Sequence, residues 1–147
     1  MTEASGAILG CDYGTRRTGL AVCPAGMGVA VGLPTVEATT PAEAARRVAA
    51  AAHERDVESI VVGLPLNARG ERGEQAAATE VFVEALRREF AGPVHLWDER
   101  FTSAQSERAL HEMGERVRGR KGRVDQVAAT LMLQSFLDSR PRRTSSE

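Results

Sequence analysis

The chain has 147 residues, of which 42% are hydrophobic and 27% charged, as is ordinary for a globular domain. Its formal net charge of −1 gives no overall reason to expect binding of nucleic acid and argues mildly against it. No apolar run approaches the roughly 18 residues of a membrane span, and the N-terminus lacks the pattern of a signal peptide. We therefore expect a cytoplasmic protein without membrane contact, in which residues 1–139 form one domain and residues 140–147 form a polar, disordered tail.

The first third of the chain predicts three consecutive strands. Residues Ala7–Asp12 are short and apolar, as in a buried strand, and Thr18–Cys23 follow after a turn rich in Gly, Thr and Arg. Val29–Val36 form a third candidate, which Gly32 and Pro34 weaken. Such short connections favour antiparallel pairing of neighbouring strands.

Two cysteines, Cys11 and Cys23, lie within the apolar runs of the first two predicted strands. In a hairpin about Thr15 and Arg16, Cys11 would face the region of Leu20, with Cys23 further along. We therefore predict two buried, reduced thiols, and neither a disulfide nor a zinc site.

The middle of the chain predicts a strand–helix–strand unit. Thr40 suits a helix N-cap, Pro41 the first helical position and Glu43 a capping box, so we expect a helix that continues to about Arg55. Ser59–Leu64 is an unbroken apolar, β-branched run, which indicates a strand covered on both faces. A helix between two such strands implies parallel pairing with a right-handed crossover.

The second half continues to alternate between helices and strands. In the first of these helices we expect Val81, Ala85 and Leu86 to share a face. The whole order predicts an α/β fold with a mixed central sheet, three antiparallel leading strands followed by parallel ones, flanked by helices. The remaining predicted segments are a helix from Glu74 to about Phe90, a strand Val94–Asp98, a helix Ser103–Met113, a flexible basic segment Gly114–Arg123 and a helix Val124–Leu137.

Asp12 is the first candidate site residue, because it stands where a buried strand breaks into a glycine-rich turn. Backbone N–H groups of such a turn can approach a phosphate, and Arg16 and Arg17 could contact its oxygens. The structural alternative is that Asp12 only closes an Asx-type turn into the hairpin.

A second pair of acids, Asp98 and Glu99, follows the predicted strand Val94–Asp98. The carboxyl ends of parallel strands lie at one edge of a sheet, so this pair and Asp12 would share that edge. Adjacent residues of a strand face opposite ways, so only one of the pair should point to the site. Capping of the following helix is the alternative role.

Asp125 opens the last predicted helix, directly after a segment in which five of the eight residues from Arg116 to Arg123 are basic. Its alternative role is a helix N-cap, and the basic segment could be a solvated loop. Three carboxylates together could hold two Mg²⁺ or Mn²⁺ ions about 4 Å apart for in-line phosphodiester cleavage. Further candidates for contact with the substrate are Asn67, Arg118, Arg120, Lys121 and Arg123.

Four motifs in register resemble those of the bacterial YqgF (RuvX-like) family. The resemblance covers residues 6 to 139 and rests on Asp12-Tyr13-Gly14-Thr15 with Gly19, Val61–Asn67, Asp98-Glu99-Arg100 with Thr102, and Asp125-Gln126 with the apolar helix. It implies a ribonuclease H-like fold and a nuclease that trims the 5′ end of precursor 16S ribosomal RNA. It also implies that Asp12, one acid of the Asp98–Glu99 pair and Asp125 bind the metal. We favour Glu99 for its longer reach and keep Asp98 as the alternative.

Three further functions compete with a ribonuclease that acts on structured RNA. One is a structure-selective endonuclease for branched DNA such as a Holliday junction, which would act as a homodimer because a four-way junction needs two symmetric cuts. Another is a non-catalytic RNA-binding assembly factor whose acids are helix caps. The last is a nucleotide-dependent phosphotransferase, suggested by the turn after Asp12, but one domain leaves no second half to close over a nucleotide.

Overall fold

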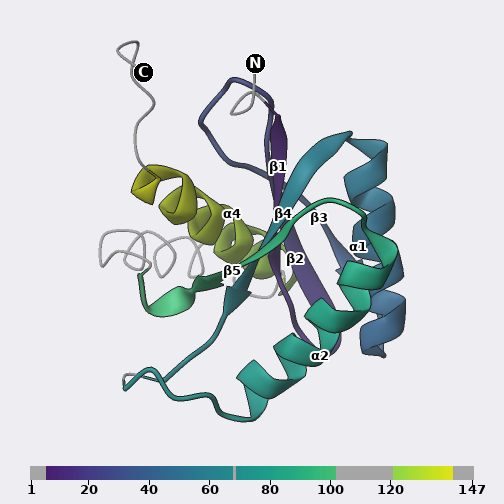
Figure 1. The fold of residues 1–147 in the computed structure, drawn as a ribbon, viewed down its shortest axis with the longest axis vertical. Helices are drawn as coiled ribbons and strands as arrows, with labels where there is room; N and C mark the ends of the chain where they lie inside the picture. The colour runs from purple at the N-terminus through teal and green to yellow at the C-terminus, as the bar shows by residue number, and fades with distance from the viewer. Residues whose placement is uncertain (1–5, 68, 102–120, 141–147) are drawn as a thin grey trace.

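A five-stranded mixed sheet forms the centre of the computed structural model, which describes residues 6–67, 69–101 and 121–140, apart from the side chains of 101 and 121–125 (Figure 1). The strand order is β3-β2-β1-β4-β5, antiparallel between β3, β2 and β1 and parallel between β1, β4 and β5. This is the predicted topology of three leading antiparallel strands followed by parallel ones. The strands are β1 (Ala7–Asp12), β2 (Arg17–Cys23), β3 (Val31–Glu37), β4 (Val57–Leu64) and β5 (Val94–Asp98).

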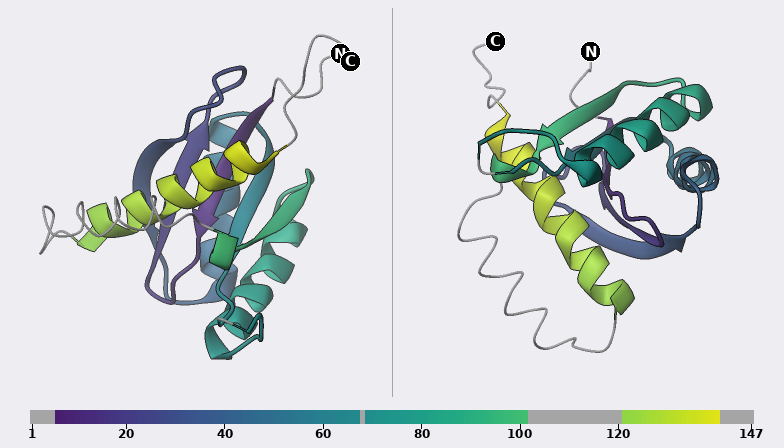
Figure 2. Two further views of the ribbon diagram at one scale, coloured as in Figure 1. Left: turned by 90° about the vertical axis from the view of Figure 1, so that its left-hand side faces the viewer. Right: turned by 90° about the horizontal axis from the view of Figure 1, so that it is seen from below.

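Helices cover both faces of this sheet. The helices α1 (Pro41–Glu54) and α2 (Glu74–Glu89) lie together on one face, and α4 (Lys121–Ser139) crosses the strands on the other (Figures 1 and 2). Two separate apolar cores result, one containing Val48, Phe82 and Leu86 beneath α1 and α2, the other containing Met132 and Leu133 beneath α4. Burial on both faces explains the unbroken apolar sequences of β1 and β4.

The start of α1 follows its sequence signals closely. The Oγ1 atom of Thr40 accepts a hydrogen bond from the Glu43 backbone N–H at 3.1 Å, and Pro41 takes the first helical position. The Glu43 side chain accepts from the N–H of Thr39 at 3.3 Å, one residue before the expected capping-box partner. Local sequence therefore determines where this helix begins.

Three boundary or packing predictions were wrong. The third strand begins at Val31 rather than Val29, because the preceding glycines Gly26 and Gly28 adopt positive φ in the loop. Val81 of α2 is 56% exposed, since the buried stripe of this helix runs through Phe82 and Leu86 instead. The basic segment was expected to reach Arg123, but α4 already begins at Lys121.

The two cysteines are buried and reduced, as predicted. Cys11 pairs across the hairpin with Leu20 and belongs to the core beneath α1 and α2. Cys23 pairs with Ile8 and belongs to the core beneath α4. Their thiols are therefore on opposite faces of the sheet, which excludes a disulfide.

The helix α4 lies across a row of small residues. Gly32, Ala21 and Gly10 are neighbours across β3, β2 and β1. A Cβ atom on Gly10 would lie 2.8 Å from the Leu133 side chain, and one on Gly32 would lie 2.6 Å from that of Gln126. Because these positions lack bulk, α4 approaches the sheet closely, and its path over the strands is fixed. None of the helices that the structure describes is long and apolar enough to cross a membrane.

Candidate active site

Three parallel strands end at one edge of the sheet, and acidic residues stand at two of these ends. β1 ends at Asp12 and β5 at Asp98, while β4 between them ends at Leu64. Along β1, Ile8 belongs to the core beneath α4 and Cys11 to the opposite core, so the alternation places Asp12 on the α4 face. The edge is thus the one that the sequence predicted, and the acid faces α4.

Glu99 joins Asp12 on this face. It opens the short 3-10 helix η1 (Glu99–Phe101) directly after β5, and its side chain is hydrogen-bonded to Asp12. The carboxylate of Glu99 lies over Gly63, where any Cβ atom would overlap it. Cys11 pairs with Val62, so Asp12 and Gly63 stand side by side at the next position. The absence of a side chain at Gly63 creates the space in which the two acids meet.

The electrostatics of this pair are shown by the pKa of Glu99. Burial raises the pKa of Glu99, its hydrogen bond to Asp12 lowers it, and the nearby negative charge of Asp98 raises it, with a net shift upward. Two carboxyl groups in contact each disfavour the ionised form of the other. A divalent cation could pair with both acids.

The chemistry of the donors fits a hard cation. Carboxylate oxygens are the ligands that Mg²⁺ and Mn²⁺ prefer, and neither Cys nor His takes part in the Asp12–Glu99 contact. Within residues 6–67, 69–101 and 126–140, however, no group of three His, Cys, Asp or Glu side chains comes together. The described part of the site is a carboxylate pair, and the expected third acid has to come from elsewhere.

Asp98, the neighbour of Glu99, is engaged differently. The Arg100 guanidinium contacts both of its carboxylate oxygens, at 3.1 Å from Nε to Oδ1 and 2.6 Å from Nη2 to Oδ2. These hydrogen bonds, together with the positive charge, hold the pKa of Asp98 below its usual range. Of the two adjacent acids, Glu99 thus interacts with Asp12, while Asp98 interacts with Arg100.

Asp125 lies within α4, whose backbone is helical from Lys121. Four residues further on, Ala129 is fully buried beneath the helix in the core on the α4 face. The side chains of Lys121, Arg123 and Asp125 lie outside the described part of the structure, as do residues Arg118 and Arg120. The predicted roles of these residues remain predictions, as does the helix Ser103–Met113.

Two predicted contact residues, Arg16 and Arg17, lie at the same end of the molecule as Asp12. Arg16 is exposed in the β1–β2 turn, and Arg17 is partly buried at the start of β2. Both line a cavity of about 600 Å³, together with Thr39 and the acids Glu37 and Glu43. The position suits contact with phosphate, but the lining carries both signs of charge.

Asn67 follows β4 at this edge, where its side chain is bound within its own loop. Its Oδ1 atom accepts from the backbone N–H groups of Arg69 and Glu71, both at 2.9 Å, and its Nδ2 atom donates to the Glu71 carboxylate at 2.9 Å. In this conformation the Asn67 side chain stabilises its own loop. Contact with substrate would require these hydrogen bonds to break.

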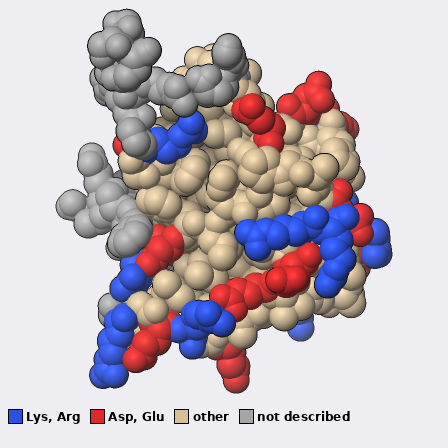
Figure 3. Space-filling view, viewed as in Figure 1, with Lys and Arg blue, Asp and Glu red and all other residues tan. Residues whose placement is uncertain are grey.

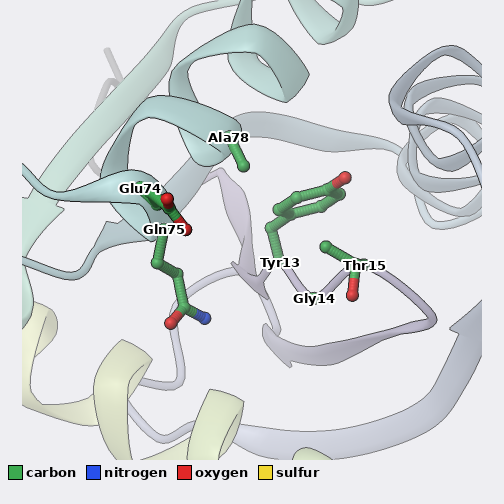
Figure 4. Close-up of a pocket in the computed structure, with 6 residues that line it drawn as sticks. All are labelled: Tyr13, Gly14, Thr15, Glu74, Gln75 and Ala78. Carbon is green, nitrogen blue, oxygen red and sulfur yellow. The ribbon is translucent and has the colours of Figure 1, made fainter.

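A second cavity, of about 360 Å³, lies between the turn that follows Asp12 and the start of α2. Figure 4 shows the Tyr13 ring facing α2 near Ala78, with Glu74 and Gln75 across the cavity. The ring stacks on Phe82 at 4.6 Å, which anchors the turn after Asp12 to the core beneath α2. Sequence reasoning did not identify Tyr13 as an anchor, although its alternation with Asp12 placed it on the buried face.

Charges on the described surface are mixed. On the face shown in Figure 3, basic and acidic side chains alternate over its lower half, and neither sign forms a continuous field. This agrees with the net charge of −1. A polyanion would therefore be attracted by local clusters of Lys and Arg and not by the overall charge.

The family model described as RuvX, Holliday junction resolvase, matches residues 6–139. The chain belongs to the RuvX family. A relative from Chloroflexus aggregans, named "Putative pre-16S rRNA nuclease", is 44% identical over 133 residues, which are 90% of this chain and 94% of that protein. A relative of the same name from Opitutus terrae is also 44% identical over 133 residues, 90% of this chain and 91% of its own.

Solved structures show which fold the RuvX family chain adopts. RuvC from T. thermophilus, in complex with a Holliday junction substrate, matches with a TM-score of 0.57 at 20% identity, over 90% of this chain and 95% of RuvC. The fowlpox virus resolvase with its Holliday junction DNA gives 0.54 at 12% identity, over 90% and 97%. The fold is therefore ribonuclease H-like, as the sequence predicted.

Proposed function

We propose that this chain is a divalent-metal-dependent nuclease that processes the 5′ end of precursor 16S ribosomal RNA in the cytoplasm. The observation that carries the proposal is the hydrogen-bonded Asp12–Glu99 pair over Gly63, at the edge where the parallel strands end. Two acids held in contact disfavour each other's ionised form, so such a pair is consistent with a site that binds a positive ligand. The choice of precursor 16S ribosomal RNA as the substrate rests on the names of the RuvX relatives.

In this proposal Asp12 and Glu99 hold Mg²⁺ or Mn²⁺, and Asp125 completes the set of acids. When bound, the metal would stabilise the negative charge that develops on the phosphate during cleavage. Asp12 and Glu99 would orient the scissile phosphate by holding that ion against the sheet edge. Arg16, Arg17 and the basic residues Arg118, Arg120, Lys121 and Arg123 would contact phosphates on either side.

A second candidate function is cleavage of branched DNA. It is supported by the description of the RuvX family and by two structural neighbours that hold Holliday junctions. Both functions need the same acids and the same backbone contacts. The DNA function additionally requires two copies of the chain, because a four-way junction is cut at two symmetric positions.

The test compares a 5′-extended precursor RNA with a matched DNA junction, using the wild-type protein and Asp12→Asn, with and without Mn²⁺. We expect the wild type to cleave the RNA only with metal. We expect Asp12→Asn to be at least about 100-fold slower, since loss of groups that merely orient metal ligands already costs 10- to 100-fold. Asp56→Asn is the matched control, because Asp56 precedes β4 at the opposite end of the sheet.

Each other outcome has a defined meaning. Cleavage of the junction alone would replace the RNA function by the DNA function, and deoxy substitution at the RNA cleavage site would confirm which sugar is required. If the wild type bound the RNA without cleaving it, and Asp12→Asn bound it equally well, the chain would be a non-catalytic assembly factor. Equal cleavage by Asp12→Asn and wild type would show that the site is wrong.

A further inference from the structure

Arg100 closes a tight ring around the backbone that carries Glu99. Its backbone N–H donates to the Asp98 Oδ1 atom at 2.9 Å, while its guanidinium grips both Asp98 oxygens at 2.6 to 3.1 Å. The residues that flank Glu99 are thus bound to each other through side chain and backbone. The position of the Glu99 backbone depends on this ring.

The same guanidinium lies against a neighbouring loop. A Cβ atom on Gly70 would lie 3.0 to 3.2 Å from the Arg100 guanidinium, and Gly70 adopts a φ of +81° that favours glycine. The loop is itself held in shape by a bridge between Leu66 and Arg72 and by the hydrogen bonds of Asn67. Arg100 therefore lies against a loop that is stabilised by its own hydrogen bonds.

Stability alone does not explain this arrangement. The Arg100 side chain is 35% exposed and that of Asp98 17%, so solvent screens the pair in part, and its bidentate geometry orders the chain around Glu99 as well as stabilising it. Nor is Asp98 well placed to bind metal, because the Arg100 guanidinium occupies both of its oxygens.

We infer that Asp98 and Arg100 are positioning residues: their ion pair, braced against the loop from Leu66 to Arg72, holds Glu99 over Gly63 in the geometry that binds metal. This rests on the proposed metal site and adds two residues that act through Glu99. It also connects the loop after β4 to the acids.

Arg100→Gln separates this role from the alternative in which Asp98 is a metal ligand. Removing a positive charge near a cation site strengthens cation binding on electrostatic grounds, and it would also free Asp98 to coordinate. A positioning role requires the opposite result, weaker binding, because Glu99 loses its fixed backbone. The sign of the change therefore distinguishes the two roles.

The experiment measures Mn²⁺ binding to the full chain without nucleic acid, by the paramagnetic resonance signal of free Mn²⁺. We expect Arg100→Gln and Asp98→Asn each to weaken binding about 10-fold, at the lower end of the effects of residues that orient metal ligands. The double variant should be no weaker than either single one, because the two residues act as a unit. Arg100→Lys should recover only part of the affinity, since lysine cannot bind both oxygens in the same plane.

Two comparisons complete the test. Arg55→Gln removes the same charge at the end of α1, next to the start of β4 and far from the acids, where Arg55 pairs with Glu54 at 3.6 Å, and it should leave Mn²⁺ affinity unchanged. Asn67→Ala loosens the loop and should weaken it about threefold. Unfolding midpoints in metal-free buffer should be nearly the same for Arg100→Gln and wild type, which a purely structural role would not give.

The contrary results are equally clear. Unchanged or tighter binding in Arg100→Gln would overturn the positioning role while the metal site stands, and an unchanged Asn67→Ala would remove the loop from it. If the wild type bound Mn²⁺ no better than Asp12→Asn, the proposed metal function would itself fail, and the inference would fall with it.

Discussion

Glu99 is placed where a negative charge is unfavourable. Its carboxylate is partly buried, lies over Gly63 and meets a second acid, Asp12, while a third, Asp98, stands next to it in the chain. Asp98 is compensated by Arg100, but among the described residues no salt bridge compensates Glu99. At the residue scale, the energetic cost of this arrangement supports the proposed cation site, since a purely structural acid would be paired or exposed.

The raised pKa of Glu99 predicts how stability depends on pH in metal-free buffer. The unfolded side chain loses its proton near the ordinary value of 4.5, whereas the folded one retains it to higher pH. Between these limits the folded state binds more protons than the unfolded state, so the free energy of unfolding falls as pH rises. The contribution of Glu99 to the free energy of unfolding is fully present at low pH. It is lost as the pH rises through the pKa that Glu99 has in the folded state.

Glu99→Gln should remove this loss. The amide cannot ionise and can still donate a hydrogen bond to Asp12, so the variant should melt a few degrees higher than wild type at pH 8 and nearly equally at pH 4. A difference of about 1 kcal/mol corresponds to roughly 2–4 °C for a domain of this size. Thermal melts with a chelator measure it, and Glu58→Gln, an exposed acid at the far end of β4, is the control. A lower melting temperature for Glu99→Gln at pH 8 would contradict the assignment.

At the scale of elements, the site depends on how strand β4 ends between β1 and β5. β4 supplies no acid, but its glycine at position 63 leaves the space that Glu99 occupies. The register fixes this, because Gly63 pairs with Trp97 on one side and follows the Val62–Cys11 pair on the other. A strand that carries no chemistry of its own therefore decides whether two acids can meet.

Gly63→Ala tests that role directly. The added Cβ atom overlaps the Glu99 carboxylate, so Glu99 must leave its position over the strand. We expect Mn²⁺ affinity and cleavage rate to fall at least about 10-fold, comparable to the loss of a group that orients metal ligands. The fold should persist, because alanine is well tolerated where φ is negative. Gly73→Ala, with no atom within 4 Å of its Cβ position, should leave the affinity unchanged, and equal affinities of the two variants would refute the argument.

For the whole molecule, the path of α4 is the decisive feature. The helix shares the sheet face with Asp12, and it lies across the row of Gly32, Ala21 and Gly10 (Figure 2). At its other end Phe136 packs edge-on against Trp97 at 5.7 Å, close to the start of η1. The helix α4 thus carries Asp125 near its beginning and packs, near its end, against β5, the edge strand that precedes Glu99.

The charge of the whole molecule predicts a specific salt dependence. With a net charge of −1 and mixed charges on the described surface, affinity for RNA should come from local phosphate contacts. Replacing Arg118, Arg120 and Arg123 by Gln should reduce the slope of log affinity against log salt by roughly 2, at about 0.7 per contact with a single strand. Filter binding of Asp12→Asn, with and without the three replacements, measures both slopes. An unchanged slope would show that the basic segment does not contact phosphate.

Much of the architecture is determined by local sequence. β1 and β5 have the predicted bounds, and α1 begins where Thr40 and Pro41 require, because apolar runs, caps and turns act over a few neighbouring residues. The meeting of Asp12 with one acid of the second pair was also predictable, since parallel strands end at one edge. Val81 was misplaced because helical period alone does not say which stripe faces the core.

Other features of the site were decided by tertiary structure. That Glu99 and not Asp98 meets Asp12, that Arg100 occupies Asp98, and that Gly63 provides the space all depend on which strands are neighbours and in what register. The sequence alone determined which acids stand at strand ends and which turns follow them. Only the packed sheet decided which of them face one another, because contacts between residues far apart in the chain are set by register and by the shape of the core.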